Sequence, residues 1–288
     1  MISSEDTEVL YRGMGREALD VAYNNAAAVV DSAAFIARWD RESVAIREQA
    51  ASGSELRVEL NIRYANTERG TLDLFLQSNN LSPTLVFIHG GYWQLNSKDR
   101  FSFVAKGPLS VGMNVAILGY TLAPQAHMDE IVQEVRQGVR WVTEHIEARG
   151  GDPKRIGVAG WSAGGHLAAL AMSSPNVQHG LTISGIFDLE PIRLNYLNNK
   201  LQMTEDEARR NSPIMNLPTH AGYLTVSVGA EELPELKRQS SSYYEAWRAA
   251  GLQGRHLVVP GRHHFAVLEE LARSNGALVD VLRAWEWR

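Results

Sequence analysis

From residue 84 onward, short apolar runs alternate with longer amphipathic stretches. The apolar runs are rich in β-branched residues and nearly continuous in hydrophobicity, and the clearest are TLVFIHG (84–90), NVAILGY (114–120), RIGVAG (155–160), LTISG (181–185), YLTVSVG (223–229) and RHLVVPG (255–261). Such runs are typical of strands buried on both faces of a parallel sheet. Segments of helical length, such as residues 128–150, lie between most of them. This alternation predicts a mostly parallel, doubly wound α/β sheet.

The N-terminal part of the chain follows two other periods. Between residues 15 and 50, apolar side chains recur three and four residues apart, which predicts a helical segment with Leu19, Tyr23, Ala26, Val30, Ala33 and Ala37 on its apolar face. Residues 56–64 and 71–77 instead alternate apolar and polar side chains around the sequence NTERG. This pattern predicts an antiparallel hairpin that is exposed on one face.

One connection between predicted strands is longer than the others and spans residues 187–220. Open α/β sheets bind ligands at the carboxyl ends of their strands, so we interpret this insertion as a small cap over that edge. The sequence contains no internal repeat and no Pro/Gly/Ser-rich linker. Residues 1–288 are therefore expected to form a single domain.

The strand predicted at 155–160 leads into the sequence GWSAG, which is followed by a helical pattern. This is the G-x-S-x-G motif in a strand–turn–helix context, where the serine occupies a strained turn and the residues two positions before and after it must lack side chains. Gly160 and Gly164 meet that requirement. We interpret Ser162 as a nucleophile at the positive end of the following helix. The alternative is an incidental serine in a glycine-rich turn.

A glycine pair follows an earlier predicted strand, in the sequence HGGYW (89–93). Adjacent glycines let backbone N–H groups point into a site without obstruction, and a tetrahedral oxyanion needs such donors. We expect the amides of Gly91 and Tyr92 to form an oxyanion hole together with the amide of Ala163, the residue after the nucleophile. Taken alone, the same sequence also fits a tight turn with a core histidine.

A serine nucleophile needs a general base and an acid that orients the base, in the chain order serine, acid, histidine for this arrangement. The loop after the last predicted strand contains His263 and His264. We assign the base to His264, with His263 as the alternative. The acid is expected after the strand at 223–229, where we assign Glu232, with Glu231 as the alternative.

Two further polar residues receive structural roles. Asp188 follows an earlier strand than the acid should, so we expect it to anchor the cap. His166 lies one helical turn after Ser162, and we expect it to pack in the interior or line the pocket.

The composition removes several competing classes of protein. The chain has no cysteine, which excludes disulfide scaffolds, thiol nucleophiles and cysteine-ligated zinc. With 28 basic and 33 acidic residues the net charge is −5. We therefore expect no nucleic-acid partner and no membrane partner, because no basic surplus is present. The motifs H-E-x-x-H, G-x-G-x-x-G after a strand, and Walker A do not occur, so no metal and no cofactor are expected.

The first residues, MISSEDTEVLYRG, carry acids and no apolar run, so they do not have the pattern of a signal or transit peptide. The longest apolar stretches fall short of the roughly 18 residues that a membrane helix needs. A cytoplasmic protein is therefore expected.

Several of these motifs together resemble those of the kynurenine formamidase (arylformamidase) type of α/β-hydrolase, within the wider group of hormone-sensitive-lipase-like esterases. The resemblance covers about residues 84 to 271 and depends on HGGYW, GWSAGGHLA, SGIFDLEPI, NSP, ELPELKRQS and HHF. It implies an α/β-hydrolase fold that cleaves N-formyl-L-kynurenine or a similar aryl formamide through an acyl-enzyme. Glu232 departs from the aspartate expected in many relatives, and its side chain is one methylene longer.

Four aromatic residues flank these motifs, and we assign them as substrate-binding residues: Tyr92, Trp93, Trp161 and Phe265. They would present aromatic walls to an aryl substrate, and the alternative is that they pack in the core or the cap.

The same residues fit other functions. A carboxylesterase, or a hydrolase of another small amide in a catabolic pathway, would use the same nucleophile, base and acid. A ligand-binding module with a hydrolase fold would instead lack the serine or the histidine, and both are present. The expected partner is a small-molecule substrate, and a homodimer is compatible with the sequence.

Overall fold

The computed structural model of the protein describes residues 8–49 and 56–287. Within these ranges eight strands form one sheet in the order β1-β2-β4-β3-β5-β6-β7-β8. The strands are β1 (Arg57–Arg63), β2 (Thr71–Leu76), β3 (Ser82–Ile88), β4 (Asn114–Leu118), β5 (Gly151–Trp161), β6 (Val177–Ile183), β7 (Tyr223–Gly229) and β8 (Gly254–Val259). All pairs from β4 to β8 are parallel. The predicted mostly parallel sheet is confirmed, and each of the six apolar runs forms one of its strands.

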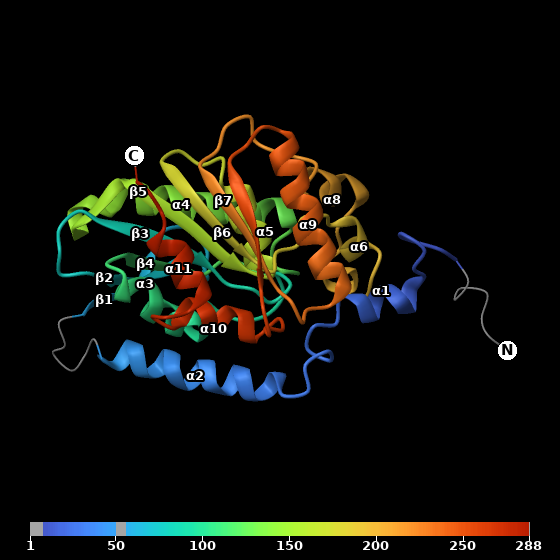
Figure 1. The fold of residues 1–288 in the computed structure, drawn as a ribbon, viewed down its shortest axis with the longest axis horizontal. Coiled ribbons are helices and arrows are strands. Elements are labelled where there is room, and N and C mark those ends of the chain that lie inside the picture. The colour runs from blue at the N-terminus through green and yellow to red at the C-terminus, as the bar shows by residue number, and fades with distance from the viewer. Residues whose placement is uncertain (1–7, 50–55, 288) are drawn as a thin grey trace.

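Helices cover both faces of the sheet (Figure 1). The first face is covered by α4 (Met128–His145), α5 (Ala163–Ala171) and α9 (Pro234–Ala249). The second face is covered by α2 (Ser32–Gln49), the 3-10 helix η3 (Lys98–Ala105), α3 (Lys106–Ser110), α10 (Ala266–Ala272) and α11 (Ala277–Arg283). A short 3-10 helix, η4 (Glu147–Arg149), follows α4. The doubly wound arrangement follows from strands whose side chains are apolar on both faces.

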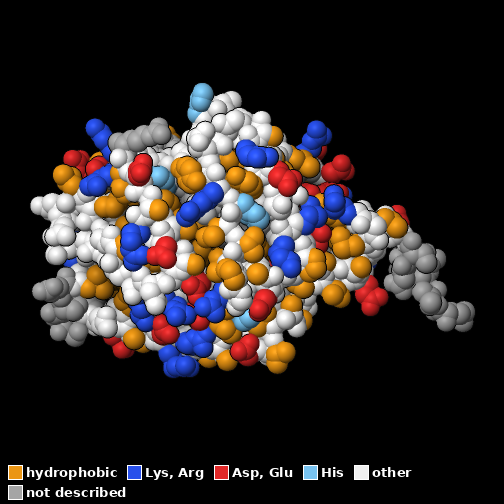
Figure 2. Space-filling view, viewed as in Figure 1, with side chains coloured by type: hydrophobic (Ala, Val, Ile, Leu, Met, Phe, Trp, Pro, Cys, Tyr) orange, Lys and Arg blue, Asp and Glu red, His pale blue; other side chains and the backbone are white. Residues whose placement is uncertain are grey.

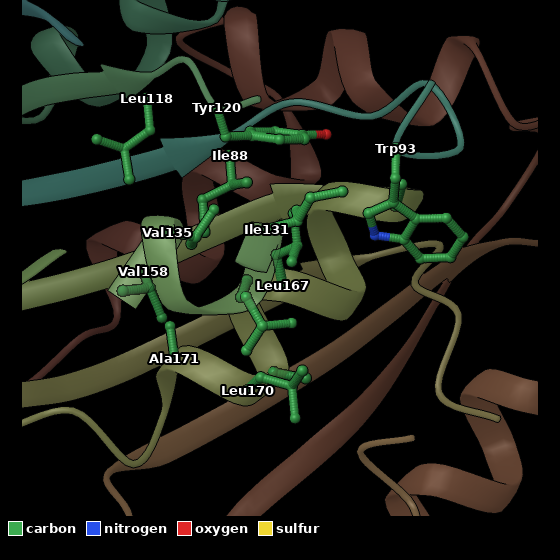
Figure 3. Close-up of a cluster of buried hydrophobic side chains, with 14 of the residues drawn as sticks. Ile88, Trp93, Leu118, Tyr120, Ile131, Val135, Val158, Leu167, Leu170 and Ala171 are labelled. Atoms are coloured by element: carbon green, nitrogen blue, oxygen red, sulfur yellow. The ribbon is translucent and has the colours of Figure 1, made fainter. Parts of the chain in front are cut away.

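Successive residues of each strand divide the core into two layers. In β3, Val86 and Ile88 belong to the cluster under α4 and α5, while Leu85 and Phe87 belong to the cluster under α2 and η3. Side chains alternate across a strand, so one continuous apolar run supplies both layers. Figure 3 shows the first layer, where Ile88 and Val158 of the sheet lie near Ile131 and Val135 of α4 and Leu167 of α5.

The predicted N-terminal helical segment is two helices rather than one. These are α1 (Arg16–Ala22) and α2, and a turn region separates them. The side chain of Asn24 accepts a hydrogen bond from the N–H of Ala27 at 3.2 Å, a local contact that favours a turn over a helix. Two expectations concern positions outside the described residues. The expected helix end depends on residue 50, and the expected lack of a signal peptide depends on residues 1–7.

The apolar face predicted for this segment is correct for its first part and wrong for its second. Leu19 and Tyr23 are buried, whereas the predicted Ala26, Val30, Ala33 and Ala37 are exposed. The buried face of α2 consists instead of Phe35, Trp39, Ser43 and Ile46. Large aromatic side chains gain more from burial than alanines do, so they decided which face of α2 meets the core.

The predicted hairpin is present, because β1 pairs antiparallel with β2. Of its two strands, only β1 has an exposed face. The second face of β2 is covered by α2 and η3, and Phe75 and Asp73 are fully buried there. The Asp73 carboxylate is neutralised there by Lys98 at 2.7 Å and Arg47 at 2.5 Å. A buried carboxylate needs such partners.

Ion pairs join α2 to the segment that it covers. Arg100 of η3 binds Asp40 at 2.8 Å, and Lys106 of α3 binds Glu42 at 2.8 Å. On the face seen in Figure 2, Lys and Arg side chains are interspersed with Asp and Glu. That face therefore carries charges of both signs next to each other.

The insertion at 187–220 contains three short helices, α6 (Glu190–Arg193), α7 (Asn198–Leu201) and α8 (Glu205–Asn211). Asp188 accepts a hydrogen bond from the N–H of Glu190 at 3.0 Å and from the hydroxyl of Tyr11 at 2.7 Å. It therefore links the start of the cap to the N-terminal segment, in agreement with its expected anchoring role.

Candidate active site

Ser162 lies between β5 and α5, in a backbone conformation with φ 57° and ψ −120°. This conformation costs a non-glycine residue roughly 1–3 kcal/mol and persists only where its surroundings enforce it. A Cβ on Gly160 would lie 2.0 Å from the carbonyl oxygen of Gly164, and a Cβ on Gly164 would lie 2.0 Å from that of Ile88. The two glycines therefore permit the tight turn that carries Ser162.

Glu232 and His264 form a buried pair at the carboxyl ends of β7 and β8. Nδ1 of His264 is 2.7 Å from Oε2 of Glu232, and both side chains are nearly inaccessible. The other carboxylate oxygen, Oε1, accepts hydrogen bonds from the N–H of Gly229 at 2.8 Å and from the hydroxyl of Ser184. A carboxylate only accepts hydrogen bonds, so Nδ1 of His264 carries the proton in this pair and Nε2 is left as the basic nitrogen.

The neighbouring residues that we considered as alternatives are placed differently. Glu231 is exposed, and the hydrogen bond found for it comes from its backbone N–H to the carbonyl of Arg262 at 3.0 Å. Nδ1 of His263 accepts from the N–H groups of Phe265 and Ala266, both at 3.3 Å. His263 therefore binds two N–H groups at the start of α10, and its ring packs edge-on against Phe35 at 5.0 Å.

Trp161 connects the turn that carries Ser162 to His264. Its indole N–H donates to the carbonyl oxygen of His264 at 2.9 Å, and its ring lies 4.8 Å from the His264 ring between centroids. Among the hydrogen bonds of the described residues, none joins the Ser162 hydroxyl to His264. Catalytic hydrogen bonds of this kind are often long without substrate and shorten in the Michaelis complex.

The HGG loop packs directly on the nucleophile turn. A Cβ on Gly90 would lie 2.7 Å from the carbonyl oxygen of Trp161 and 3.0 Å from Cβ of Ser162. Gly91 and Tyr92 have positive φ values of 122° and 51°. This conformation turns the loop sharply where it passes the serine.

The three amides expected in the oxyanion hole have no acceptor among the described residues. No hydrogen bond of the described backbone or side chains begins at the N–H of Gly91, Tyr92 or Ala163. Ala163 is completely buried, and buried N–H groups are nearly always paired in folded proteins. Free donors on both sides of Ser162 are what an anionic transition state requires.

A buried layer supports the loop from behind, and the sequence did not identify it. The carbonyl oxygen of Gly90 accepts from the Asn96 side chain at 3.1 Å and contacts Nδ1 of His89 at 2.9 Å. Tyr120 stacks on the His89 ring at 4.3 Å and donates to the His89 carbonyl at 2.9 Å. Burial lowers the pKa of His89 to about 4, so the ring is neutral near pH 7.

Trp93 does not form a substrate wall, and that part of the prediction is corrected. Its side chain is completely buried (Figure 3). Its indole N–H donates to Nδ1 of His166 at 3.2 Å. Nε2 of His166 then donates to the carbonyl of Asn211 in the cap at 2.8 Å, as expected for a packed histidine. Burial lowers the pKa of His166 to about 4.

The other three aromatic residues lie around the site. Tyr92 is half-buried, and its hydroxyl donates to the carbonyl of Tyr23 at 2.5 Å and accepts from Asn25 at 2.9 Å. Trp161 and Phe265 are mostly buried in one aromatic cluster with Trp39. The contacts of Tyr92 bring the N-terminal segment to the site, which the sequence did not indicate because that segment is about 70 residues away from the loop.

A surface cavity of about 660 Å³ lies elsewhere, at the amino-terminal ends of β6, β7 and β8, where Val177, Tyr223 and Trp285 line it. The cavity therefore lies at the amino-terminal ends of the strands, whereas Ser162 lies at their carboxyl ends. Within the described residues, no group of three or more His, Asp or Glu side chains is arranged to hold a metal ion.

Comparisons with known proteins find a family model, curated relatives and solved structures that are similar to this chain. The family model described as BD-FAE matches residues 72–217. The chain is 34% identical to the kynurenine formamidase of Danio rerio over 77% of its own length and 80% of that protein. It is 33% identical to a putative thioesterase from Silicibacter sp. TM1040, with a TM-score of 0.85, over 94% of this chain and all of that one.

The fold is shared more widely. An esterase from Pyrobaculum calidifontis has a TM-score of 0.70 at 20% identity, over 86% of this chain and 90% of that one.

In the described part of the chain, no helix combines the length and the hydrophobicity needed to cross a membrane.

Proposed function

The chain belongs to the kynurenine formamidase family of α/β-hydrolases, and we propose that it is a serine hydrolase that cleaves a small aryl formamide such as N-formyl-L-kynurenine. The observation that carries the proposal is the buried His264–Glu232 pair, 2.7 Å apart, at the same sheet edge as Ser162 in its strained turn. The family relationship supports the choice of a formamide as substrate.

The first half of the proposed reaction forms an acyl-enzyme. The Ser162 hydroxyl attacks the formyl carbon while Nε2 of His264 takes its proton, and Glu232 stabilises the imidazolium that results. The carbonyl oxygen becomes an anion and is bound by the amides of Gly91, Tyr92 and Ala163. When the tetrahedral intermediate collapses, His264 returns the proton to the amine nitrogen, and the arylamine leaves.

The second half releases formate. A water molecule attacks the formyl ester on Ser162 and passes one proton to His264, and the same three amides bind the oxyanion. Collapse of this intermediate returns the proton to Ser162. The products are a free arylamine and formic acid, which gives up its proton to the solvent to become formate, and the enzyme regains its starting protonation state.

A fluorophosphonate probe tests the nucleophile without assuming a substrate. The probe is expected to label the wild-type protein and to leave Ser162→Ala unlabelled, because the phosphonyl group attaches to the activated serine. Labelling of Ser162→Ala at the wild-type level would contradict the assignment of Ser162.

A second candidate is a small ester or thioester, supported by the likeness to the putative thioesterase. A panel that compares N-formylkynurenine, other formanilides, short-chain p-nitrophenyl esters and unrelated small amides by kcat/KM separates the candidates. We expect the highest kcat/KM for the formyl arylamines. A much higher value for an ester would overturn the formamidase proposal and leave the serine mechanism intact.

A further inference from the structure

Ser184 is the residue directly after β6. In the folded protein it lies between Ser162 and Glu232. The preceding residue, Ile183, accepts a hydrogen bond from the N–H of Ser162 at 2.8 Å. The N–H of Ser184 itself donates to the carbonyl of Ser227 in β7 at 2.8 Å. Because β6 is between β5 and β7 in the sheet, its carboxyl end contacts the strands that carry both groups.

The hydroxyl of Ser184 donates to Oε1 of Glu232, in an environment that excludes water. The same oxygen accepts from the N–H of Gly229 at 2.8 Å. Two donors therefore hold Oε1, and Oε2 faces Nδ1 of His264 at 2.7 Å. Hydrogen bonds to a charged acceptor are stronger than neutral ones.

The backbone of Ser184 has a φ of 53°, in the left-handed region that favours glycine. Ser184 is also completely buried. A glycine would relieve the backbone at this position but would remove the hydroxyl. The bond to Glu232 is the contact that a serine side chain adds here.

We propose that Ser184 is a positioning residue that fixes the carboxylate of Glu232, so that Oε2 alone meets His264. A glutamate has one more rotatable bond than an aspartate, and one backbone donor leaves its carboxylate free to rotate about the last bond. The second donor removes that freedom. This inference rests on the proposed function, because it takes His264 as the base of Ser162.

The test compares Ser184→Ala and Ser184→Gly with the matched control Ser240→Ala. Ser240 lies on α9, is completely buried, and has a hydroxyl with no hydrogen-bond partner among the described residues. The readouts are the rate of fluorophosphonate labelling, and kcat and KM for the best substrate of the panel. Thermal unfolding identifies any variant that does not fold. If Ser184→Ala does not fold, Ser184→Gly decides the test, because glycine tolerates the positive φ at this position.

Both Ser184 variants are expected to lose roughly ten- to a hundredfold in labelling rate and in kcat, as for loss of a hydrogen bond to a charged group, while KM stays within about twofold. Ser240→Ala is expected to react like the wild type. Wild-type labelling and kcat in Ser184→Gly would overturn the inference, and so would an equal loss in Ser240→Ala.

A double-mutant cycle shows whether Ser184 acts through Glu232. In the Glu232→Gln background, Ser184→Ala is expected to lower the labelling rate by less than about twofold, because coupled residues are not additive. An undiminished loss there would overturn the inference. Failure of the wild type to be labelled at Ser162 would instead contradict the proposed function, so the two failures are distinguishable.

Discussion

At the scale of single residues, the candidate acid is distinguished from its neighbour by its hydrogen bonds. Glu232 is buried and accepts from three groups, whereas Glu231, the adjacent carboxylate, is exposed. The two side chains have the same chemistry and differ only in their surroundings. Matched variants of the two residues therefore measure the effect of those surroundings.

Glu232→Gln is expected to lower kcat by on the order of a thousandfold or more, because an amide in place of the carboxylate favours the wrong imidazole tautomer. Glu231→Gln should stay within about threefold of the wild type, since surface substitutions have small effects. Steady-state kinetics and the labelling rate measure both. If Glu231→Gln lost more activity than Glu232→Gln, the acid would have to be reassigned by one position.

The two adjacent histidines form a second matched pair. His264→Ala is expected to abolish measurable labelling of Ser162, because it removes the base. His263→Ala should retain labelling and instead lower the unfolding free energy by about 1 kcal/mol, the typical net value of an intramolecular hydrogen bond, because His263 accepts from two N–H groups at the start of α10. Loss of labelling in a folded His263→Ala would contradict this division of roles.

At the scale of elements, α2 forms the outer wall behind the nucleophile turn. Trp39 of α2 stacks on Phe103 with ring centroids 5.2 Å apart and packs edge-on against Trp161 at 5.4 Å. Its indole N–H donates to Glu269 of α10 at 3.1 Å. One side chain therefore joins α2 to η3, to the turn that carries Ser162 and to α10.

Trp39→Ala is expected to lower the unfolding free energy by about 3–5 kcal/mol, the usual effect of removing a large buried aromatic side chain. Val44→Ala on the exposed side of the same helix is the control and should change it by less than about 0.5 kcal/mol. Urea unfolding followed by circular dichroism measures both. Equal effects of the two substitutions would contradict the orientation of α2.

At the scale of the whole molecule, two buried neutral histidines make stability depend on pH. Burial lowers the pKa values of His89 and His166 to about 4, whereas an unfolded histidine titrates near 6.5. Between these pH values the unfolded chain binds more protons than the folded one, so the unfolding free energy falls as the pH falls. Each residue contributes a loss on the order of 2–3 kcal/mol by pH 4.5.

His166→Gln should reduce this acid sensitivity, because glutamine does not titrate and its amide nitrogen can still donate to Asn211. The difference in unfolding free energy between pH 7 and pH 4.5, measured by urea unfolding, is expected to be smaller than in the wild type by about one histidine's contribution. His220→Gln, at an exposed histidine, is the control and should leave the difference unchanged. An unaltered difference in His166→Gln would contradict the prediction.

Much of the fold could be predicted from the chain because strands and helices have local periods. The strands β3 to β8 appear as apolar runs that need no knowledge of their neighbours. The sequence did not predict the break between α1 and α2. Apolar residues in the alanine-rich stretch between these helices recur at helical spacing, and this spacing is the same whether the residues are buried or exposed. The burial of Asp73 was missed because it depends on Lys98 and Arg47, which come from other elements.

The sequence by itself determined the candidate nucleophile, the glycine loop and the family, because each depends on short motifs whose residues are adjacent in the chain. Only the tertiary structure decided which oxygen of Glu232 meets His264, that Ser184 holds the other, and that Trp93 packs on His166. These contacts join residues 32 to 73 positions apart. The order of strands β5 to β8 brings Ser162, Glu232 and His264 to one edge of the sheet, and no local period specifies that order.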